Sequence, residues 1–421
     1  ANTAIYAREG LVIVALAWVL MSVFGALPFI ISGDIPFFVD AFFETVSGFT
    51  TTGSSILRDV EAMSYSMLFW RSFTHWVGGM GVLVFTMAVL PVSDGRAMHL
   101  MRAESPGPSV GKISSKIRDT AKILYAMYLV LTVVQTILLR LVGLPWYDAL
   151  ITAFGAAGTG GFSNRAASIG AYGSPAVEMI TAVFMVLFGI NFNVYFFLLI
   201  RHFKEAFACE EMRVYLGVIA ASTLAVAGNI FHLYGNVWQS LRYSFFQVAS
   251  IITTTGYATT DFNMWPTFSK AVLVLLMFFG ACAGSTGGGI KTTTIFVLAQ
   301  EIRCIFSKQR PGAFRRALPA NAIAKASTIG LLGMLVVCCT TFLLCILEPG
   351  LPFISLLFEA VSAYSTAGLS TGITAQLCMA AKLVLIFTMY TGRVGAFTLL
   401  SLWVERPEPN AHFTEEAITI G

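Results

Sequence analysis

The stretch Thr50-Thr51-Thr52-Gly53-Ser54-Ser55 decides the fold, because three later stretches of the chain resemble it. These are Gly158-Thr159-Gly160-Gly161-Phe162-Ser163, Thr253-Thr254-Thr255-Gly256-Tyr257-Ala258 and Ser365-Thr366-Ala367-Gly368-Leu369-Ser370. A Thr stands two residues before a Gly in every copy, and the aligned glycines are 108, 95 and 112 residues apart. Four similar units in one chain predict a pseudo-four-fold arrangement around a single axis. Thr- and Gly-rich backbone on such an axis indicates an ion pore.

The second copy has two adjacent glycines, so its register is open by one residue. We choose Gly161 because this choice aligns Thr159 and Phe162 with the other copies. A single Thr-x-Gly triplet carries almost no information. Four triplets in register, each at the same place in a repeated pattern, are a specific signal.

The composition is that of a membrane protein. Of the 421 residues, 57% are hydrophobic and 11% are charged, and the mean hydropathy is +0.78. Soluble domains carry about 25% charged residues, and a membrane-spanning helix needs about 20 apolar residues. Eight apolar runs, the last interrupted only by Arg393, predict eight crossings. The runs are 10–33, 72–93, 123–139, 179–200, 214–241, 271–290, 326–347 and 383–404.

A short apolar segment precedes each Thr-x-Gly triplet. These segments are Pro36–Gly48, Pro145–Ala156, Trp238–Ser250 and Pro352–Ala363. Each is too short to cross a bilayer and fits a re-entrant helix. Non-helical backbone at membrane depth is tolerated only where protein buries it or water reaches it. We therefore expect an all-α membrane protein of four fused units, each with a first membrane helix (M1), a pore helix, a filter loop and a second membrane helix (M2).

The unit boundaries follow from this repeat. Unit 1 is residues 1–95 with its filter at 50–55, unit 2 is 96–205 with its filter at 158–163, unit 3 is 206–315 with its filter at 253–258 and a broken second helix at 280–291, and unit 4 is 316–421 with its filter at 365–370. The linkers between units and the two chain ends carry 17 of the 26 Lys and Arg residues. The positive-inside rule places these linkers and both termini in the cytoplasm.

The expected chemistry is coordination of a cation by the main chain. Rings of backbone carbonyl oxygens replace the hydration shell in potassium filters, and the C-termini of pore helices add partial negative charge. The residues expected to present these oxygens are Thr51, Thr52, Gly53, Thr159, Gly160, Gly161, Thr254, Thr255, Gly256, Thr366, Ala367 and Gly368. Glu44 and Glu359 occupy equivalent places before two of the loops. Two interpretations of them are open, since they can add negative charge or anchor the pore helices by hydrogen bonds.

The chain resembles the membrane subunit of the Trk/Ktr/HKT family of potassium transporters, closest to the TrkH type. The resemblance rests on the four loops, on the stretches 76–81 (WVGGMG) and 280–289 (GACAGSTGGG), and on Gly392-Arg393. In that family a Gly in every filter loop accompanies potassium selectivity, so Gly53 implies K⁺ as the transported ion, with no bound organic cofactor. The resemblance also implies a homodimer in the plasma (bacterial inner) membrane, in contact with lipid and a cytosolic nucleotide-binding regulatory subunit of the TrkA or KtrA type.

A glycine-rich stretch interrupts the second helix of unit 3. Each Gly costs about 1 kcal/mol in a helix interior, so this stretch predicts a loop within the membrane, and the resemblance implies an intramembrane gate. Close helix packing against glycines is the alternative. The candidate gate residues are Gly284, Ser285, Thr286, Gly287, Gly288, Gly289, Lys291 and Arg393. An intramembrane charge such as Arg393 is costly; the resemblance implies an electrostatic barrier, and a structural ion pair is the alternative. Lys291 is a weaker candidate that can also snorkel to the interface.

Two transport mechanisms fit the sequence. The first is a gated, channel-like potassium pore. The second is a secondary symporter coupled to H⁺ or Na⁺, although such folds usually have two inverted repeats. An enzyme is not expected, because no HExxH or GxSxG motif occurs. A nucleic-acid partner is not expected either, because no basic stripe is interleaved with aromatic residues.

Overall fold

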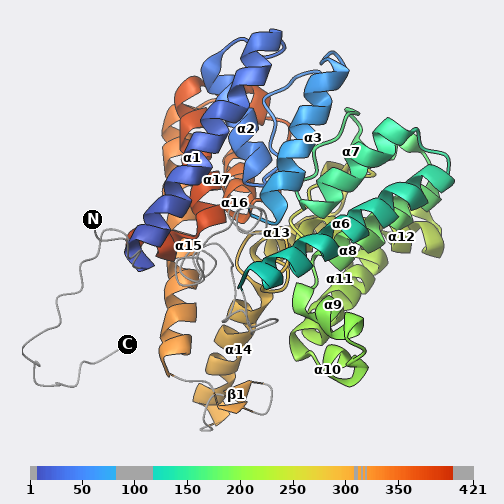
Figure 1. Ribbon diagram of the computed structural model, residues 1–421, viewed down its shortest axis with the longest axis vertical. Coiled ribbons are helices and arrows are strands. Elements are labelled where there is room, and N and C mark those ends of the chain that lie inside the picture. The colour runs from blue at the N-terminus through green and yellow to red at the C-terminus, as the bar shows by residue number, and fades with distance from the viewer. Residues whose placement is uncertain (1–6, 82–116, 308–311, 314–315, 318–319, 402–421) are drawn as a thin grey trace, which may run out of the picture.

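The computed structural model describes residues 7–81, 117–307, 312–313, 316–317 and 320–401, which form an almost entirely helical molecule (Figure 1). The α-helices are α1 (Ala7–Ser32), α2 (Phe38–Phe49), α3 (Tyr65–Gly79), α6 (Ile117–Leu141), α7 (Trp146–Ala157), α8 (Pro175–Phe188), α9 (Phe192–Leu199), α10 (Phe203–Phe207), α11 (Glu210–Tyr234), α12 (Val237–Ile252), α13 (Thr267–Phe278), α14 (Thr292–Ser307), α15 (Ala320–Leu347), α16 (Phe353–Ser365), α17 (Met379–Val394) and α18 (Ala396–Ser401). Short 3-10 helices lie at Ser168–Tyr172, Phe262–Met264 and Thr374–Gln376, and two-residue strands β1 (Gly312–Ala313) and β2 (Arg316–Ala317) pair antiparallel. The predicted all-α membrane class is confirmed.

Four helices of the described part of the chain are each long and apolar enough to span a membrane. They are α1, α6, α11 and α15, and their apolar segments have a mean hydropathy of 1.8 to 2.6. Only 28–33% of the residues in these segments are buried within the protein. Side chains such as Leu20, Leu224 and Phe342 are exposed, which suits a helix face in contact with lipid tails rather than water.

Four short helices follow the long ones, as the sequence predicts. α2, α7, α12 and α16 have 12, 12, 16 and 13 residues, and each packs against the long helix before it. Pro145 and Pro352 are the N-cap residues of α7 and α16. The side chain of Asn236 caps α12 by accepting a hydrogen bond from the Trp238 amide at 2.9 Å. Each short helix ends at a Thr-x-Gly loop.

The sequence predicted a break in the second helix of unit 3 only, but the second helices of units 2 and 4 are interrupted as well. α8 and α9 meet at an angle of 91°, α13 and α14 are separated by residues 279–291, and α17 ends at Val394, just before Gly395, whose φ is +92°. In unit 1, α3 ends at Gly79, and residues 82–93 of the expected run lie outside the described part of the chain. A run without charges predicts an apolar segment, but it does not show where glycines end the helix.

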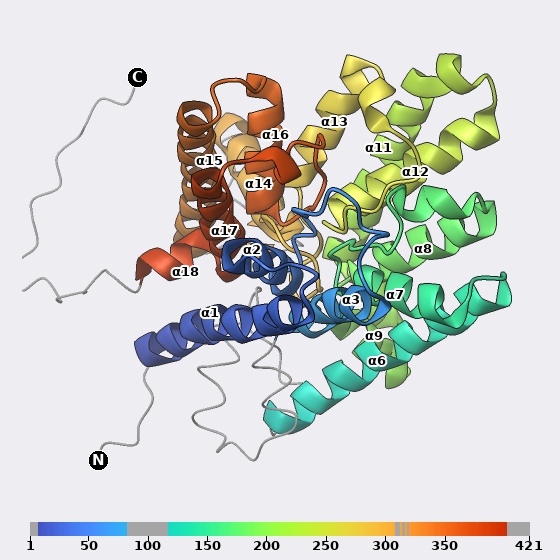
Figure 2. The ribbon, with the colours of Figure 1, turned by 90° about the horizontal axis from the view of Figure 1, so that it is seen from above.

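The units follow one another around a common centre (Figure 2). In every case the second helix of one unit packs against the short helix of the next, in the pairs α3–α7, α8–α12, α13–α16 and α17–α2. The last pair joins unit 4 to unit 1 and closes the ring. This repeated contact brings the ends of the four short helices together, although they are far apart in the sequence.

Candidate ion-conduction site

The four Thr-x-Gly loops have the same backbone conformation. The φ angles are +56°, +54°, +59° and +52° at Thr51, Thr159, Thr254 and Thr366, and +86°, +75°, +85° and +68° at Gly53, Gly161, Gly256 and Gly368. A positive φ is unusual for a β-branched residue such as Thr and costs of the order of 1–3 kcal/mol. The shared geometry places Gly161, rather than Gly160, in register with the other glycines.

The amides of these loops donate back into the short helices. In loop 1 the N–H groups of Thr52 and Gly53 both point to the carbonyl oxygen of Ser47, at 2.9 and 3.4 Å. Gly155 and Ser250 accept the same pair of bonds in loops 2 and 3, and in loop 4 the Ala367 amide donates to Ser362 at 2.9 Å. Within the described part of the chain, no hydrogen bond reaches the carbonyl oxygens of the twelve residues predicted to coordinate the ion. Buried carbonyls without donors need an explanation.

The loops also touch one another in cyclic order. A Cβ atom built on the aligned glycine of each loop would clash with a carbonyl oxygen of the following unit. The clashing pairs are Gly53 with Gly160, Gly161 with Thr255, Gly256 with Ala367, and Gly368 with Thr52. The first two residues of each loop are buried and the third is half-buried. The structure therefore brings all twelve predicted residues into one closed ring, and only glycine fits at its third position.

Glu44 and Glu359 anchor the ring. Glu44 accepts hydrogen bonds from the Ser55 hydroxyl at 2.9 Å and the Ile56 amide at 3.1 Å, and it forms an ion pair with Arg71. Glu359 accepts from the Thr374 hydroxyl at 3.0 Å, the Thr371 amide at 3.3 Å and the Ser370 hydroxyl. Both carboxylates are 1% exposed. These contacts favour the anchoring interpretation, because both side chains tie the segment after a loop to the short helix before it.

Arg71 and His75 hold the loop of the neighbouring unit, a role that we did not predict. The Arg71 guanidinium lies 3.5 Å from the ring centroid of Phe162 and donates to the Ser163 carbonyl at 3.0 Å. His75 stacks on Phe162 with centroids 4.0 Å apart. Because these partners are about 90 residues away in the chain, no local pattern could have indicated them.

The glycine loop, residues 279–291, lies against loops 3 and 4. Its base is closed by the Gly280 amide, which donates to the Ile290 carbonyl at 2.8 Å. At its far end, the Gly288 amide donates to the Thr254 hydroxyl at 2.8 Å. A Cβ atom built on Gly288 would clash with the Thr366 hydroxyl, and one on Gly287 would lie 3.1 Å from the Thr253 carbonyl oxygen. Gly287 and Gly288 thus allow the loop to approach the ring closely.

Arg393 lies where the ring and the glycine loop meet. Its Nη1 donates to the Thr51 hydroxyl at 3.1 Å and the Thr286 carbonyl at 3.2 Å, and its Nη2 donates to the carbonyls of Gly78 and Gly79 at 2.6 and 3.1 Å. One guanidinium therefore connects units 1, 3 and 4. Lys291 is half-buried and donates to the Gly287 carbonyl, a contact within the glycine loop.

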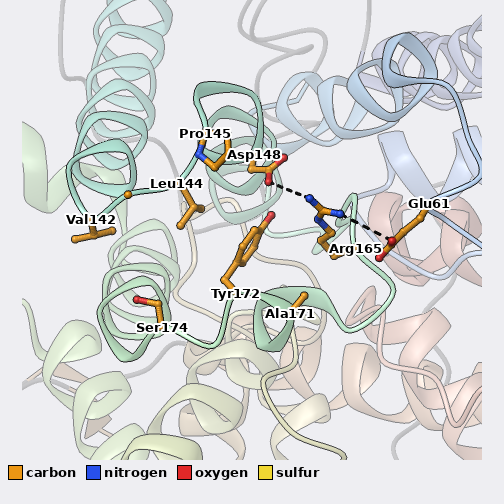
Figure 3. Close-up of a pocket in the computed structure, with 10 residues that line it drawn as sticks. Glu61, Val142, Leu144, Pro145, Asp148, Arg165, Ala171, Tyr172 and Ser174 are labelled. Atoms are coloured by element: carbon orange, nitrogen blue, oxygen red, sulfur yellow. Dashed lines mark ion pairs between the residues drawn. The ribbon is translucent and has the colours of Figure 1, made fainter.

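A pocket of about 500 Å³ is lined by residues that follow loop 2, such as Arg165 and Tyr172 (Figure 3). Arg165 crosses it and lies 3.9 Å from Glu61 and 3.7 Å from Asp148. Asn164 connects the other oxygen of Asp148, at 2.6 Å, to the Tyr172 hydroxyl, at 3.2 Å. Burial and the nearby Asp148 raise the pKa of Tyr172 to about 12, so its hydroxyl remains a donor. These groups brace loop 2 against unit 1.

Comparisons with known proteins agree with this architecture. A family model described as a cation transport protein, TrkH, matches residues 1–412. The chain is 35% identical over 414 residues to the Trk system potassium uptake protein TrkH of Salmonella typhimurium, covering 94% of this chain and 85% of that protein. It is 33% identical over 298 residues to TrkG of Escherichia coli, covering 70% and 61%. The crystal structure of the potassium transporter TrkH from Vibrio parahaemolyticus superposes with a TM-score of 0.83 at 30% identity, covering 96% of this chain and 86% of that one. The chain belongs to the TrkH family of cation transport proteins.

Proposed function

We propose that this protein takes up potassium through a gated, channel-like pore whose filter is the ring of Thr-x-Gly loops. One observation carries the proposal: twelve backbone carbonyl oxygens, in four loops with positive φ angles at the same two positions, receive no hydrogen bond within the described part of the chain. A dehydrated monovalent cation supplies the missing partner, since carbonyl rings replace its hydration shell. The short helices add the partial negative charge of their C-termini.

Potassium is the proposed ion for two reasons. All four loops have Gly at the third position, and the relatives described above are potassium uptake proteins. The ring is held from outside by buried ion pairs and hydrogen bonds such as that between Glu44 and Arg71. A filter held at a fixed diameter can discriminate between ions of different size.

The glycine loop and Arg393 are the proposed gate. The loop lies against loops 3 and 4, and Arg393 adds a fixed positive charge next to Thr51. A cation leaving the ring on this side would meet both. Opening would require the loop to move away from the ring, which its four glycines between 284 and 289 permit.

The remaining features of the proposal follow the family. The four units have the boundaries given above, the protein lies in the bacterial inner membrane, and both termini face the cytoplasm. It forms a homodimer, and a cytosolic nucleotide-binding subunit of the TrkA or KtrA type controls the gate. The basic linkers Arg102–Lys122 and Arg303–Lys325 are the proposed contacts for that subunit, and their basic residues equally serve as topology determinants.

The decisive experiment is a current–voltage measurement on the purified protein in liposomes, with and without a candidate cytosolic subunit. We expect currents whose reversal potential follows the potassium gradient. Electroneutral uptake that requires a proton or sodium gradient would contradict the pore mechanism and support the symporter mechanism. No feature of the described structure favours that second mechanism.

A further inference from the structure

The first half of the glycine loop is bound to the bend between α8 and α9. The Cys282 amide donates to the Gly189 carbonyl at 3.1 Å, and the Phe192 amide donates to the Gly284 carbonyl at 3.0 Å. The Thr286 hydroxyl donates to the Phe188 carbonyl at 3.2 Å. The last carbonyls of a helix have no partner within the helix. The 91° bend therefore frees backbone groups of unit 2, and the glycine loop of unit 3 occupies them.

Two polar side chains secure this contact. Glu211, in the first turn of α11, accepts from the Ala283 amide at 2.6 Å through one oxygen and from the Asn191 amide group at 3.3 Å through the other. The side-chain oxygen of Asn191 caps α9 by accepting from the Asn193 amide at 3.0 Å. A Cβ atom built on Gly284 would lie 3.1 Å from the same oxygen. One carboxylate and one amide thus join α9, α11 and the glycine loop.

We propose that Asn191 and Glu211 are positioning residues that hold the glycine loop in its closed place. This inference rests on the proposed gate and adds to it the contact that must break on opening. The bend between α8 and α9 is the seat of the loop, and the Glu211 carboxylate is its clamp.

The location of the clamp gives it a route to the cytoplasmic side. α9 and α10 lie in the lower part of the molecule, on the same side as α14 and β1 (Figure 1). A displacement of α9 would strain the bonds of Phe192 and Asn191 to the loop and to Glu211. The clamp therefore has a bonded state and a broken state, and a force on α9 shifts the equilibrium between them.

The test uses the full-length protein in liposomes, with single-channel recording in a potassium gradient and no cytosolic subunit. Glu211→Ala removes both hydrogen bonds that the Glu211 carboxylate accepts, from the Ala283 amide and from the Asn191 side chain. Asn191→Ser keeps a good N-cap residue for α9, but its side chain is too short to reach Glu211. We expect each variant to increase the open fraction about 3- to 30-fold, the range typical of residues that couple two sites. The K⁺/Na⁺ permeability ratio should not change, because the ring is untouched.

The matched control is Glu210→Ala, one residue away in the same helical turn. Glu210 pairs with Arg213 at 3.6 Å on the surface, and this variant should behave as the wild type. The double variant Asn191→Ser/Glu211→Ala should open no more than Glu211→Ala alone, since both changes break one contact. If Glu211→Ala is not recovered as a folded protein, Glu211→Gln with Asn191→Ser gives the same comparison.

The outcomes separate this inference from the proposed function. If the wild type conducts potassium selectively and both single variants leave the open fraction unchanged, the clamp is wrong and the pore stands. If the permeability ratio falls together with the rise in opening, the residues support the whole fold and do not position the loop. If the wild type passes no selective current, the proposed function itself fails.

Discussion

The ring of Thr-x-Gly loops and the region of the second helices come from the same four repeats, yet they differ in one respect. In the ring, the four copies share positive φ angles, contacts with the next loop, and a hydrogen bond from the amide of the second position to the short helix. In the second helices each unit differs: unit 2 bends, unit 3 has the glycine loop, and unit 4 contributes Arg393. Coordination of one ion from all sides needs equivalent ligands. The proposed gate needs one movable element, a seat and a charge, and this requirement would account for the loss of equivalence in the second helices.

The sharpest way to break the ring is to remove its anchor in unit 1. Glu44→Gln would leave the buried Arg71 charge without its carboxylate, which should lower the free energy of unfolding by about 3 kcal/mol. Glu359→Gln is the matched change in unit 4, where the carboxylate binds two hydroxyls and one amide. Glu359→Gln should lower the free energy of unfolding by about 1 kcal/mol. Thermal unfolding of the two variants in detergent measures the difference, and equal losses would show that the Arg71 pair does not stabilise the ring.

The next prediction tests the equivalence of the four glycines. Gly53→Ser places a side chain where the Gly160 carbonyl lies, so the ring must open on one side and the K⁺/Na⁺ permeability ratio should fall more than about tenfold, equivalent to 1.4 kcal/mol. Bi-ionic reversal potentials measure the ratio. The control is Gly33→Ser, which has a similar φ of +80° but no neighbour within 4 Å of the new Cβ. An unchanged ratio in Gly53→Ser would remove loop 1 from the filter.

The third prediction concerns the asymmetric region. Arg393→Ala removes a positive charge and four hydrogen bonds between units. We expect potassium flux without a cytosolic subunit to rise about tenfold, with the permeability ratio retained. Arg393→Lys keeps the charge but cannot reproduce the planar fork, and it should give an intermediate flux. A fall in flux, or a protein that does not fold, would favour a purely structural role for Arg393.

The smallest expected effect probes the contact between the two regions. Gly288→Ala should push the glycine loop away from Thr366 and raise the basal flux about threefold, less than one kcal/mol. Gly228→Ala in α11 is the control, because a Cβ there has no neighbour within 4 Å. Tracer uptake into liposomes compares the two. Identical potassium uptake by Gly288→Ala and Gly228→Ala would mean that the glycine loop does not press on the ring.

The sequence predicted the parts that depend on local pattern. The four short helices begin and end within about two residues of their predicted segments, because an apolar run of fixed length between a long span and a Gly is a local signal. The positions of the helix breaks were predicted only in unit 3. Elsewhere a single glycine, such as Gly189 or Gly395, ends a helix, and a single glycine is also common inside packed helices.

What the sequence by itself determined is the repeat: four Thr-x-Gly triplets in register, the apolar runs around them and the lone Arg393 in the eighth run. What only the tertiary structure decided is which units touch. The packing of Phe162 on Arg71, the bonds from Arg393 to Gly78 and Thr286, and the seat of the glycine loop on the α8–α9 bend all join residues about 90 or more positions apart. Such contacts depend on how separate units close into a ring, and chain neighbours carry no information about that closure.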